Sequence, residues 1–259
     1  MIRTPLLAAL TLLVAAPSLP QSAARPVPVA EARAYRPIET IRWTYDDKSY
    51  PGGSSRQLRF KHDKSNSSVD PRSNPDVQGV IDTIAHAAPG QTISFHLDRE
   101  AGILACSGHA TGNGEGSGTC RFDPDSGFAA GLARRGIAPG DSDDLLALTL
   151  VNAHMANVDA LTGDGFHFDN SGELIAVSAL GVNPDYVSDL RQAGLKVDEL
   201  GDLIAAKALK VDGQWLGEMA RAGYPGLAVG KAIQMRALGV TPDYAMKMAR
   251  MLHAVGEIQ

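Results

Sequence analysis

The chain has 259 residues, and its 24 Lys and Arg against 29 Asp and Glu give a net charge of −5. This length allows more than one hydrophobic core. The acidic balance and the lack of an evident basic patch along the sequence exclude nucleic acid as the expected partner, because such binding needs concentrated positive charge.

The first 24 residues have the pattern of a signal peptide. Arg3 precedes an apolar run at 6–15, and small residues follow up to Ala24. The run is too short to span a bilayer, no cysteine follows it that could carry a lipid, and no later segment is apolar for long enough to cross a membrane. We therefore expect cleavage near Ala24, a flexible lead-in at 25–36 and a periplasmic or secreted protein. Retention of the segment as an anchor is the alternative.

Residues 37–124 are predicted to form a β-rich domain. Alternation of apolar and polar residues predicts strands at 41–45 and 58–60, with a Gly- and Ser-rich loop at 50–55 between them. The polar segment 61–73 is predicted to be a flexible surface segment.

A helix and a three-stranded meander complete this domain. The helix is predicted at 75–87, and its apolar side is the natural cover for the sheet. Turns at 98–102 and 111–116 separate the strands. Centring each turn gives four pairs: Leu97 with Leu104, Phe95 with Cys106, Cys106 with Cys120, and Leu104 with Phe122. Both hairpins place the same side chains on one face, so the predicted register is self-consistent.

The two cysteines of the chain, Cys106 and Cys120, lie directly opposite each other in this register. In an exported chain such a pair predicts a disulfide. The alternative is a pair of buried free thiols.

From residue 125 onward a pattern recurs every 29 residues. It aligns Val182 with Val211 and Val240, Ile175 with Ile204 and Ile233, and Gly136 with Gly165, Gly194 and Gly223. A fixed period of this size indicates stacked units that do not bury their apolar faces alone. The repeat domain at 125–259 divides into a half-unit at 125–143 and units at 144–172, 173–201, 202–230 and 231–259.

Each unit is predicted to be a helix, a capped turn, a second helix and a glycine stop. Asn183, Asp212 and Thr241 lie at N-cap positions, and Gly194 and Gly223 supply the left-handed residue after the second helix. Nine short helices of roughly ten residues result, each stabilised mainly by its neighbours. The predicted fold class is therefore α+β, with a small N-terminal antiparallel β-meander domain with one helix followed by an α-solenoid.

An aromatic ring recurs at one position of most units: Phe128, Tyr186, Trp215 and Tyr244. Such rings are expected to fill the seams between stacked helix pairs. The alternative is a ladder of rings along a partner-binding groove, which solenoids can provide.

The sequence contains no recognisable catalytic or metal-binding motif, and we expect no cofactor. The seven histidines show no ligand spacing. The acidic segment 163–173 lacks the alternating oxygens of a calcium-binding loop and is predicted to be an inter-helix turn. The Gly-rich segment 111–118 is followed by a strand rather than a helix, so a hairpin turn is favoured over a phosphate site.

The repeated Ala-Leu-Gly-Val-(Asn/Thr)-Pro-Asp-Tyr at 179–186 and 237–244, with Arg-Ala-Gly-Tyr at 221–224, resembles a bacterial helical repeat. Similar repeats are appended to membrane metallopeptidases of the β-lactam-sensor type and occur in small exported proteins. The segments 93–102 and 116–124 resemble the β-segment that precedes those repeats. The resemblance implies a sensor-like or partner-binding accessory module. It implies no catalytic residue, because the peptidase domain and its zinc motif are absent from this sequence.

The expected function is that of a non-enzymatic exported module that binds a protein partner in the cell envelope through the solenoid surface. Two alternatives stay open at this point. One is an envelope hydrolase with an unrecognised site, and the other is a purely structural envelope protein.

Overall fold

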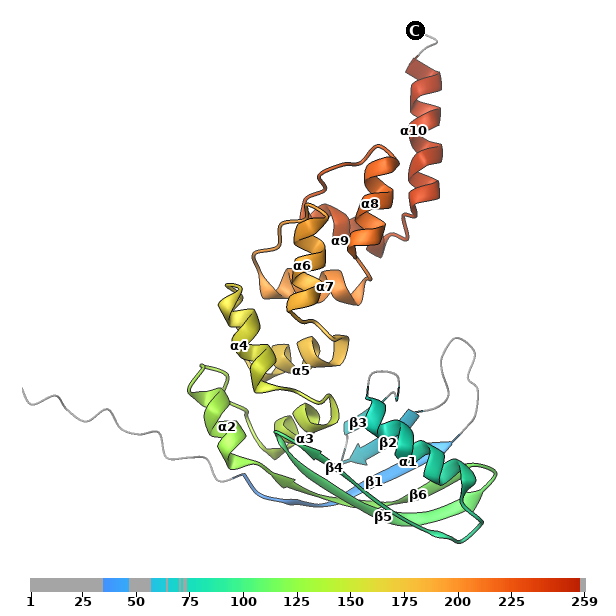
Figure 1. The fold of residues 1–259 in the computed structure, drawn as a ribbon, viewed down its shortest axis with the longest axis vertical. Helices are drawn as coiled ribbons and strands as arrows, with labels where there is room; N and C mark the ends of the chain where they lie inside the picture. Colours follow the sequence, from blue (N-terminus) through green and yellow to red (C-terminus); the bar gives the residue numbers. More distant parts are fainter. Residues whose placement is uncertain (1–34, 47–56, 64, 70, 72–73, 257–259) are drawn as a thin grey trace, which may run out of the picture. The chain divides into compact units, whose positions relative to one another are not determined.

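The fold is α+β and combines a six-stranded antiparallel sheet with a series of short helices (Figure 1). The structure is a computed structural model that describes residues 35–46, 57–63, 65–69, 71 and 74–256. The predicted signal peptide and the predicted loop at 50–55 lie outside these residues. Within the described part of the chain, no helix is both long and apolar enough to cross a bilayer.

The sheet consists of two three-stranded meanders joined edge to edge. Its strands are β1 (Ile38–Asp46), β2 (Gln57–His62), β3 (Ser65–Val69), β4 (Thr92–Arg99), β5 (Gly102–Gly112) and β6 (Glu115–Pro124). Their order is β3-β2-β1-β6-β5-β4, and every neighbouring pair is antiparallel. The pairing of β1 with β6 therefore unites the two meanders into one sheet.

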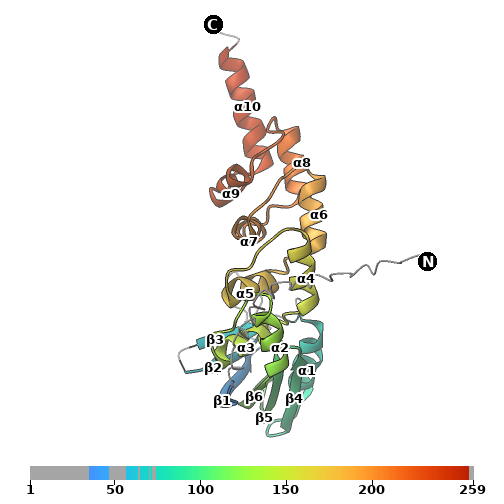
Figure 2. The ribbon, with the colours of Figure 1, turned by 90° about the vertical axis from the view of Figure 1, so that its left-hand side faces the viewer.

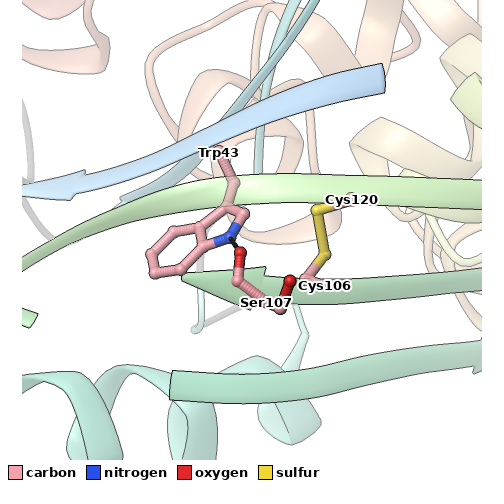
Figure 3. The surroundings of a disulfide bond; sticks show 4 residues. All are labelled: Trp43, Cys106, Ser107 and Cys120. Atoms are coloured by element: carbon pink, nitrogen blue, oxygen red, sulfur yellow. Dashed lines mark hydrogen bonds between the residues drawn. A yellow bond between two sulfur atoms is a disulfide. The ribbon is translucent and has the colours of Figure 1, made fainter. Parts of the chain in front are cut away.

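The predicted register of the second meander is confirmed. Leu97 lies opposite Leu104, and Cys106 lies opposite both Phe95 and Cys120. Leu104 also lies opposite Phe122. Cys106 and Cys120 form a disulfide, as the opposed positions predict (Figure 3).

The prediction of a flexible surface segment at 61–73 is wrong for its central part, which forms β3. This strand is Ser-Asn-Ser-Ser-Val, and only Val69 is buried. It lies at the edge of the sheet and pairs with β2 alone. An edge strand can be held by backbone hydrogen bonds along one side, so it needs little of the apolar alternation by which strands are recognised.

Two helices cover the apolar face of the sheet (Figure 1). The predicted helix is α1 (Pro75–His86), which contacts β4 and β6 and is held to β4 by an ion pair between Asp76 and the buried guanidinium of Arg99. The second is α3 (Ser142–Leu150), which contacts β3, β5 and β6. The sequence did not predict this second cover, because it assigned residues 144–172 to the repeat domain.

Trp43 is the largest fully buried side chain of the sheet, and glycines make room for it. Its indole Nε1 donates to the carbonyl oxygen of Ser107 at 3.1 Å, beside the disulfide (Figure 3). A Cβ atom at Gly108 would lie 2.7 Å from the indole, and one at Gly118 would lie 2.6 Å from it. Because real Cβ contacts are not this short, both positions exclude side chains.

From residue 125 onward, the described residues form nine helices in two rows (Figures 1 and 2). Besides α3 they are α2 (Ser126–Ala133), α4 (Met155–Gly163), α5 (Ser171–Leu180), α6 (Pro184–Gln192), α7 (Leu200–Ala208), α8 (Gly213–Arg221), α9 (Val229–Ala237) and α10 (Pro242–Gly256). Each helix contacts the helix two positions along the chain, so α3, α5, α7 and α9 form one row and α2, α4, α6, α8 and α10 form the other.

The predicted helix caps are confirmed. The side chain of Asn183 accepts a hydrogen bond from the backbone N–H of Tyr186, and Asp212 and Thr241 accept from the residues three positions on. The predicted stops, Gly194 and Gly223, have φ angles of 82° and 95°, a left-handed conformation that favours glycine.

Two contacts connect the helices to the rest of the chain in ways that the sequence did not predict. The hydroxyl of Tyr35 donates to the carbonyl oxygen of Pro139, so the end of the expected flexible lead-in is held against the α2–α3 connection. The carboxylate of Glu100, in the β4–β5 turn, accepts from the backbone N–H of Met155 and lies 2.9 Å from His154 Nδ1. Glu100 thus caps α4, whose own N-cap residue His154 makes no side-chain cap bond.

Candidate functional site

The four recurrent ring positions differ in exposure. Phe128, Tyr186 and Trp215 are buried in the first turns of α2, α6 and α8, whereas Tyr244 in α10 is 55% exposed. The rings therefore do not form a continuous exposed row. Burial at three of the four positions is what packing in a seam between helix pairs requires.

One hydrogen bond recurs at these seams. The hydroxyl of Tyr186 donates to the carbonyl oxygen of Val211 at 2.7 Å, and the amide Nδ2 of Asn157 donates to the carbonyl oxygen of Val182 at 2.9 Å. Both bonds span 25 residues. Asn157 precedes Tyr186 by one 29-residue step, so it belongs to the same series. A search for aromatic residues missed it, because an amide takes the place of the ring.

Trp215 is the exception in this series. Its indole Nε1 is buried and has no hydrogen-bond acceptor among the described residues. Like Tyr186, however, it has a cation over its ring. Lys207 Nζ lies 4.2 Å from the Tyr186 ring centroid, and Arg236 Cζ lies 5.1 Å from that of Trp215. Such cation–π contacts are attractive, and Lys207 and Arg236 are themselves one repeat step apart.

A groove of about 460 Å³ opens at the Tyr186 seam, between α6, the end of α7 and the start of α8. Its lining residues are Asn183, Asp185, Tyr186, Asp189, Lys207, Lys210, Val211 and Asp212. We refer to this set as the seam groove. Three carboxylates and two ammonium groups line it, so the seam groove offers both signs of charge.

Two of the three carboxylates make hydrogen bonds that hold the helices themselves. Asp212 caps α8, and Asp189 Oδ2 accepts from the backbone N–H of Gly213 at 2.7 Å. Burial, together with the negative charges of Asp212 and Asp189, raises the pKa of the Tyr186 phenol well above its usual value. Tyr186 therefore remains a neutral donor across the physiological range. Among the described residues, the side chains of Asp185 and Lys210 are exposed and have no such bond.

Lys210 has a left-handed backbone with φ of 57°. The equivalent positions one step before and one step after it are Gly181 and Gly239, with φ of 67° and 70°. A residue with a Cβ atom is disfavoured in this conformation by roughly 1–2 kcal/mol. Lys210 thus occupies a position at which its neighbouring units use glycine.

The acidic segment 163–173 is explained by helix capping. The side chain of Asn170 accepts from the backbone N–H of Glu173, and Glu173 Oε2 accepts from the backbone N–H of Asp169. This arrangement is a variant of the capping box at the start of α5, in which Glu173 bonds to the residue before the N-cap. Nowhere in the described part of the chain do three or more His, Cys, Asp or Glu side chains lie together as a metal site would need.

No family model, no curated protein and no solved structure matches the chain. The function must therefore be argued from the seam groove and the surfaces of the molecule. The signals that could have located the seam groove in the sequence are the lysine at a glycine position and the repeated cation at 207 and 236.

Proposed function

We propose that the helical half is an α-solenoid of 29-residue helix pairs and that its seam groove binds an extended segment of a protein partner. Support comes from the two rows of helices and from contacts that recur at the repeat step. The Asn157 and Tyr186 hydrogen bonds are equivalent, as are the Lys207 and Arg236 ring contacts. Repeated units of this kind create extended surfaces suited to peptide segments.

The observation that carries this proposal is the strained backbone of Lys210. Glycine at this position would remove the strain, as it does at Gly181 and Gly239. Residues held in sparsely populated backbone conformations concentrate at binding sites, where the strain is part of the function. Lys210 also lines the seam groove with its ammonium group uncommitted to any bond among the described residues. We infer that this charge is kept there for a ligand.

The chemistry of the seam groove indicates the kind of segment that fits. Asp185 faces a cationic group of the partner, and Lys210 faces an anionic group, while the Tyr186–Lys207 pair lines the same groove. The mixed charges favour a polypeptide that carries both signs over a uniformly charged polymer. Exposed pairs of this kind set partner choice and orientation more than total affinity.

The cellular setting is part of the same proposal. The signal-peptide pattern at residues 1–24 and the resemblance to repeats of exported bacterial proteins support a periplasmic or secreted protein. In this setting the chain acts as a non-enzymatic accessory module, and its partner is a protein of the cell envelope.

The test uses Lys210→Gly, which removes the charge and relieves the strain together. The variant is expected to be at least as stable as the parent protein but to bind the partner about ten-fold more weakly, the effect of losing one charge-assisted contact. The partner is first captured from envelope extract with the parent protein and identified, and its affinity for each variant is then measured by titration calorimetry.

The matched control is Lys247→Gln, which removes one exposed charge from α10, away from the seam groove. It should leave the affinity within about two-fold, as expected of a charge that makes no contact with the partner. Equal affinities of Lys210→Gly and the parent protein would contradict the proposal. If both variants bound the partner equally weakly, the loss of affinity would be due to net charge alone, which would also contradict the proposal.

A further inference from the structure

The face of the sheet opposite α1 and α3 carries a cationic hollow. Strands β1, β2 and β3 surround a space of about 370 Å³, which is lined by Arg42, Thr44, Gln57, Arg59, Phe60, Lys61, Asn66, Ser67 and Ser68. Three of these residues are cationic, and none is acidic. This concentration of positive charge stands out in a chain whose net charge is −5, and it corrects the expectation that the protein has no basic patch.

The register makes this hollow unfavourable for the protein alone. Arg42 lies directly opposite Lys61 on the neighbouring strand, and like charges at opposed positions destabilise a sheet. No carboxylate among the described residues pairs with either side chain. Arg59 differs, because Asp46 Oδ2 lies 2.7 Å from its Nη1. An anion that lies between Arg42 and Lys61 would relieve this repulsion.

Two rows of polar side chains lead from the hollow across the sheet. Through the strand register, Arg42 is followed by Thr119, Ser107 and Ser94, and Thr44 is followed by Ser117, His109 and Thr92. These outward positions extend the hollow into a polar strip over β1, β6, β5 and β4. The strip residues described here include no Phe, Tyr or Trp, so it lacks the rings on which bases of a nucleic acid stack.

We propose that the hollow binds an acidic polysaccharide. A carboxylate or phosphate group of the polysaccharide lies between Arg42 and Lys61, and sugar hydroxyls of the same polysaccharide bond to the polar strip. Charged groups make charge-assisted hydrogen bonds to such oxyanions, and the donors and acceptors of Ser and Thr match those of sugar hydroxyls. This inference concerns the sheet and is independent of the seam groove.

The first experiment measures binding to polygalacturonate, a carboxylate polymer, and to phosphomannan, a phosphate-bearing polymer, with dextran as the neutral control. The parent protein is expected to bind one or both acidic polymers and not dextran, and the stronger of the two identifies the oxyanion. The double variant Arg42→Gln/Lys61→Gln should bind that polymer at least ten-fold more weakly, because two charge-assisted contacts are lost.

The matched control is Lys247→Gln/Arg250→Gln, which removes two exposed charges from α10 and gives the same net charge. Its affinity should stay within about two-fold of the parent, because its charges lie outside the hollow. The melting temperature of Arg42→Gln/Lys61→Gln without polymer should not fall, because a repulsive pair has been removed. This readout separates a loss of binding from a loss of folding.

A third variant tests the direction of the effect. Asp46→Asn removes the carboxylate that neutralises Arg59, so the hollow gains positive charge and binds the acidic polymer more tightly. Three results overturn the proposal: binding of neither acidic polymer, equal weakening in the hollow and control pairs, or tighter binding of duplex DNA or of phosphatidylglycerol vesicles that depends on Arg42 and Lys61. The last result assigns the hollow to a different class of ligand.

Discussion

The two halves of the molecule differ in how far along the chain their contacts reach. In the sheet, Trp43 bonds to Ser107 across 64 residues, and β1 pairs with β6. In the helical half, the seam bonds span 25 residues and recur from unit to unit. Local, repeated contacts make stability a sum over neighbours, whereas long-range pairing makes a sheet form as a whole. A destabilising substitution should therefore affect neighbouring helices in the helical half, whereas in the sheet it should destabilise the sheet as a whole.

The largest expected effect is that of Trp215→Ala. Trp215 is buried with helices on both sides of its seam, and truncating a buried aromatic ring costs about 3–5 kcal/mol. The loss should spread to neighbouring helices while the disulfide-linked sheet survives. Urea unfolding followed by far-UV circular dichroism for the helices, and by near-UV circular dichroism for Trp43 in the sheet, measures the two halves separately.

Tyr244→Ala is the matched control in the same repeat series. Because Tyr244 is 55% exposed, its truncation should cost well under half as much as that of Trp215. Similar small losses for both variants would show that these rings do not hold the seams, and simultaneous loss of sheet and helices would show that the halves are not separable.

The disulfide gives the next largest effect, and it should be confined to the sheet. Cys106 and Cys120 are 14 residues apart, and closing a loop of this size stabilises a fold by about 3 kcal/mol in the chain-entropy model. The variant Cys106→Ser/Cys120→Ser should lose this amount in the unfolding of the sheet, with the helical transition unchanged. Alkylation of the unreduced, denatured parent protein should label neither thiol, and labelling of both would refute the bond.

A smaller effect is expected from Gly118→Ala. The added methyl group would overlap the Trp43 indole and the facing backbone of Gly108, and overpacking of this kind typically costs about 1–3 kcal/mol. Near-UV circular dichroism of Trp43 should change together with the melting temperature. Gly201→Ala in α7 is the control, because no atom lies within 4 Å of its added Cβ. An equally stable Gly118→Ala would mean that the indole does not need this space.

The smallest effect is that of Tyr186→Phe, which removes the seam hydrogen bond to Val211 and costs about 1 kcal/mol at pH 7. The substitution should also change how stability depends on pH in alkaline solution. The pKa of the Tyr186 phenol is raised by folding, so the unfolded state releases the proton first, from about pH 10 upward. The parent protein should therefore lose stability above that pH faster than Tyr186→Phe does. Parallel losses would show that this phenol is not desolvated.

The sequence predicted the local features of the fold well, because local residues determine them. The caps at Asn183, Asp212 and Thr241 depend on side chains three residues from the bonds they make. The register of β4, β5 and β6 follows from two turns and one apolar face. Strand β3 was missed because its serines carry no apolar alternation.

The candidate sites were less predictable, because each depends on residues brought together by distant pairing. Arg42 and Lys61 form a cluster only once β1 and β2 are in register. The contact of β1 with β6 and the docking of α3 on the sheet leave no periodic signal in the chain. In contrast, the lysine at the glycine position of the repeat was visible in the sequence, although its strain was not.

The cap that Glu100 provides for α4 has a consequence for the order of folding. α4 begins at Met155, and its N-cap residue His154 makes no side-chain cap bond. The helix is nine residues long, which is short for an isolated helix in water. The carboxylate that completes its first turn comes from the β4–β5 turn. Until that hairpin has formed, α4 lacks this cap, and α6 lacks one of the two helices of its row on which it packs. The sheet, which precedes these helices in synthesis, thus provides a starting point from which the helices can be added in chain order.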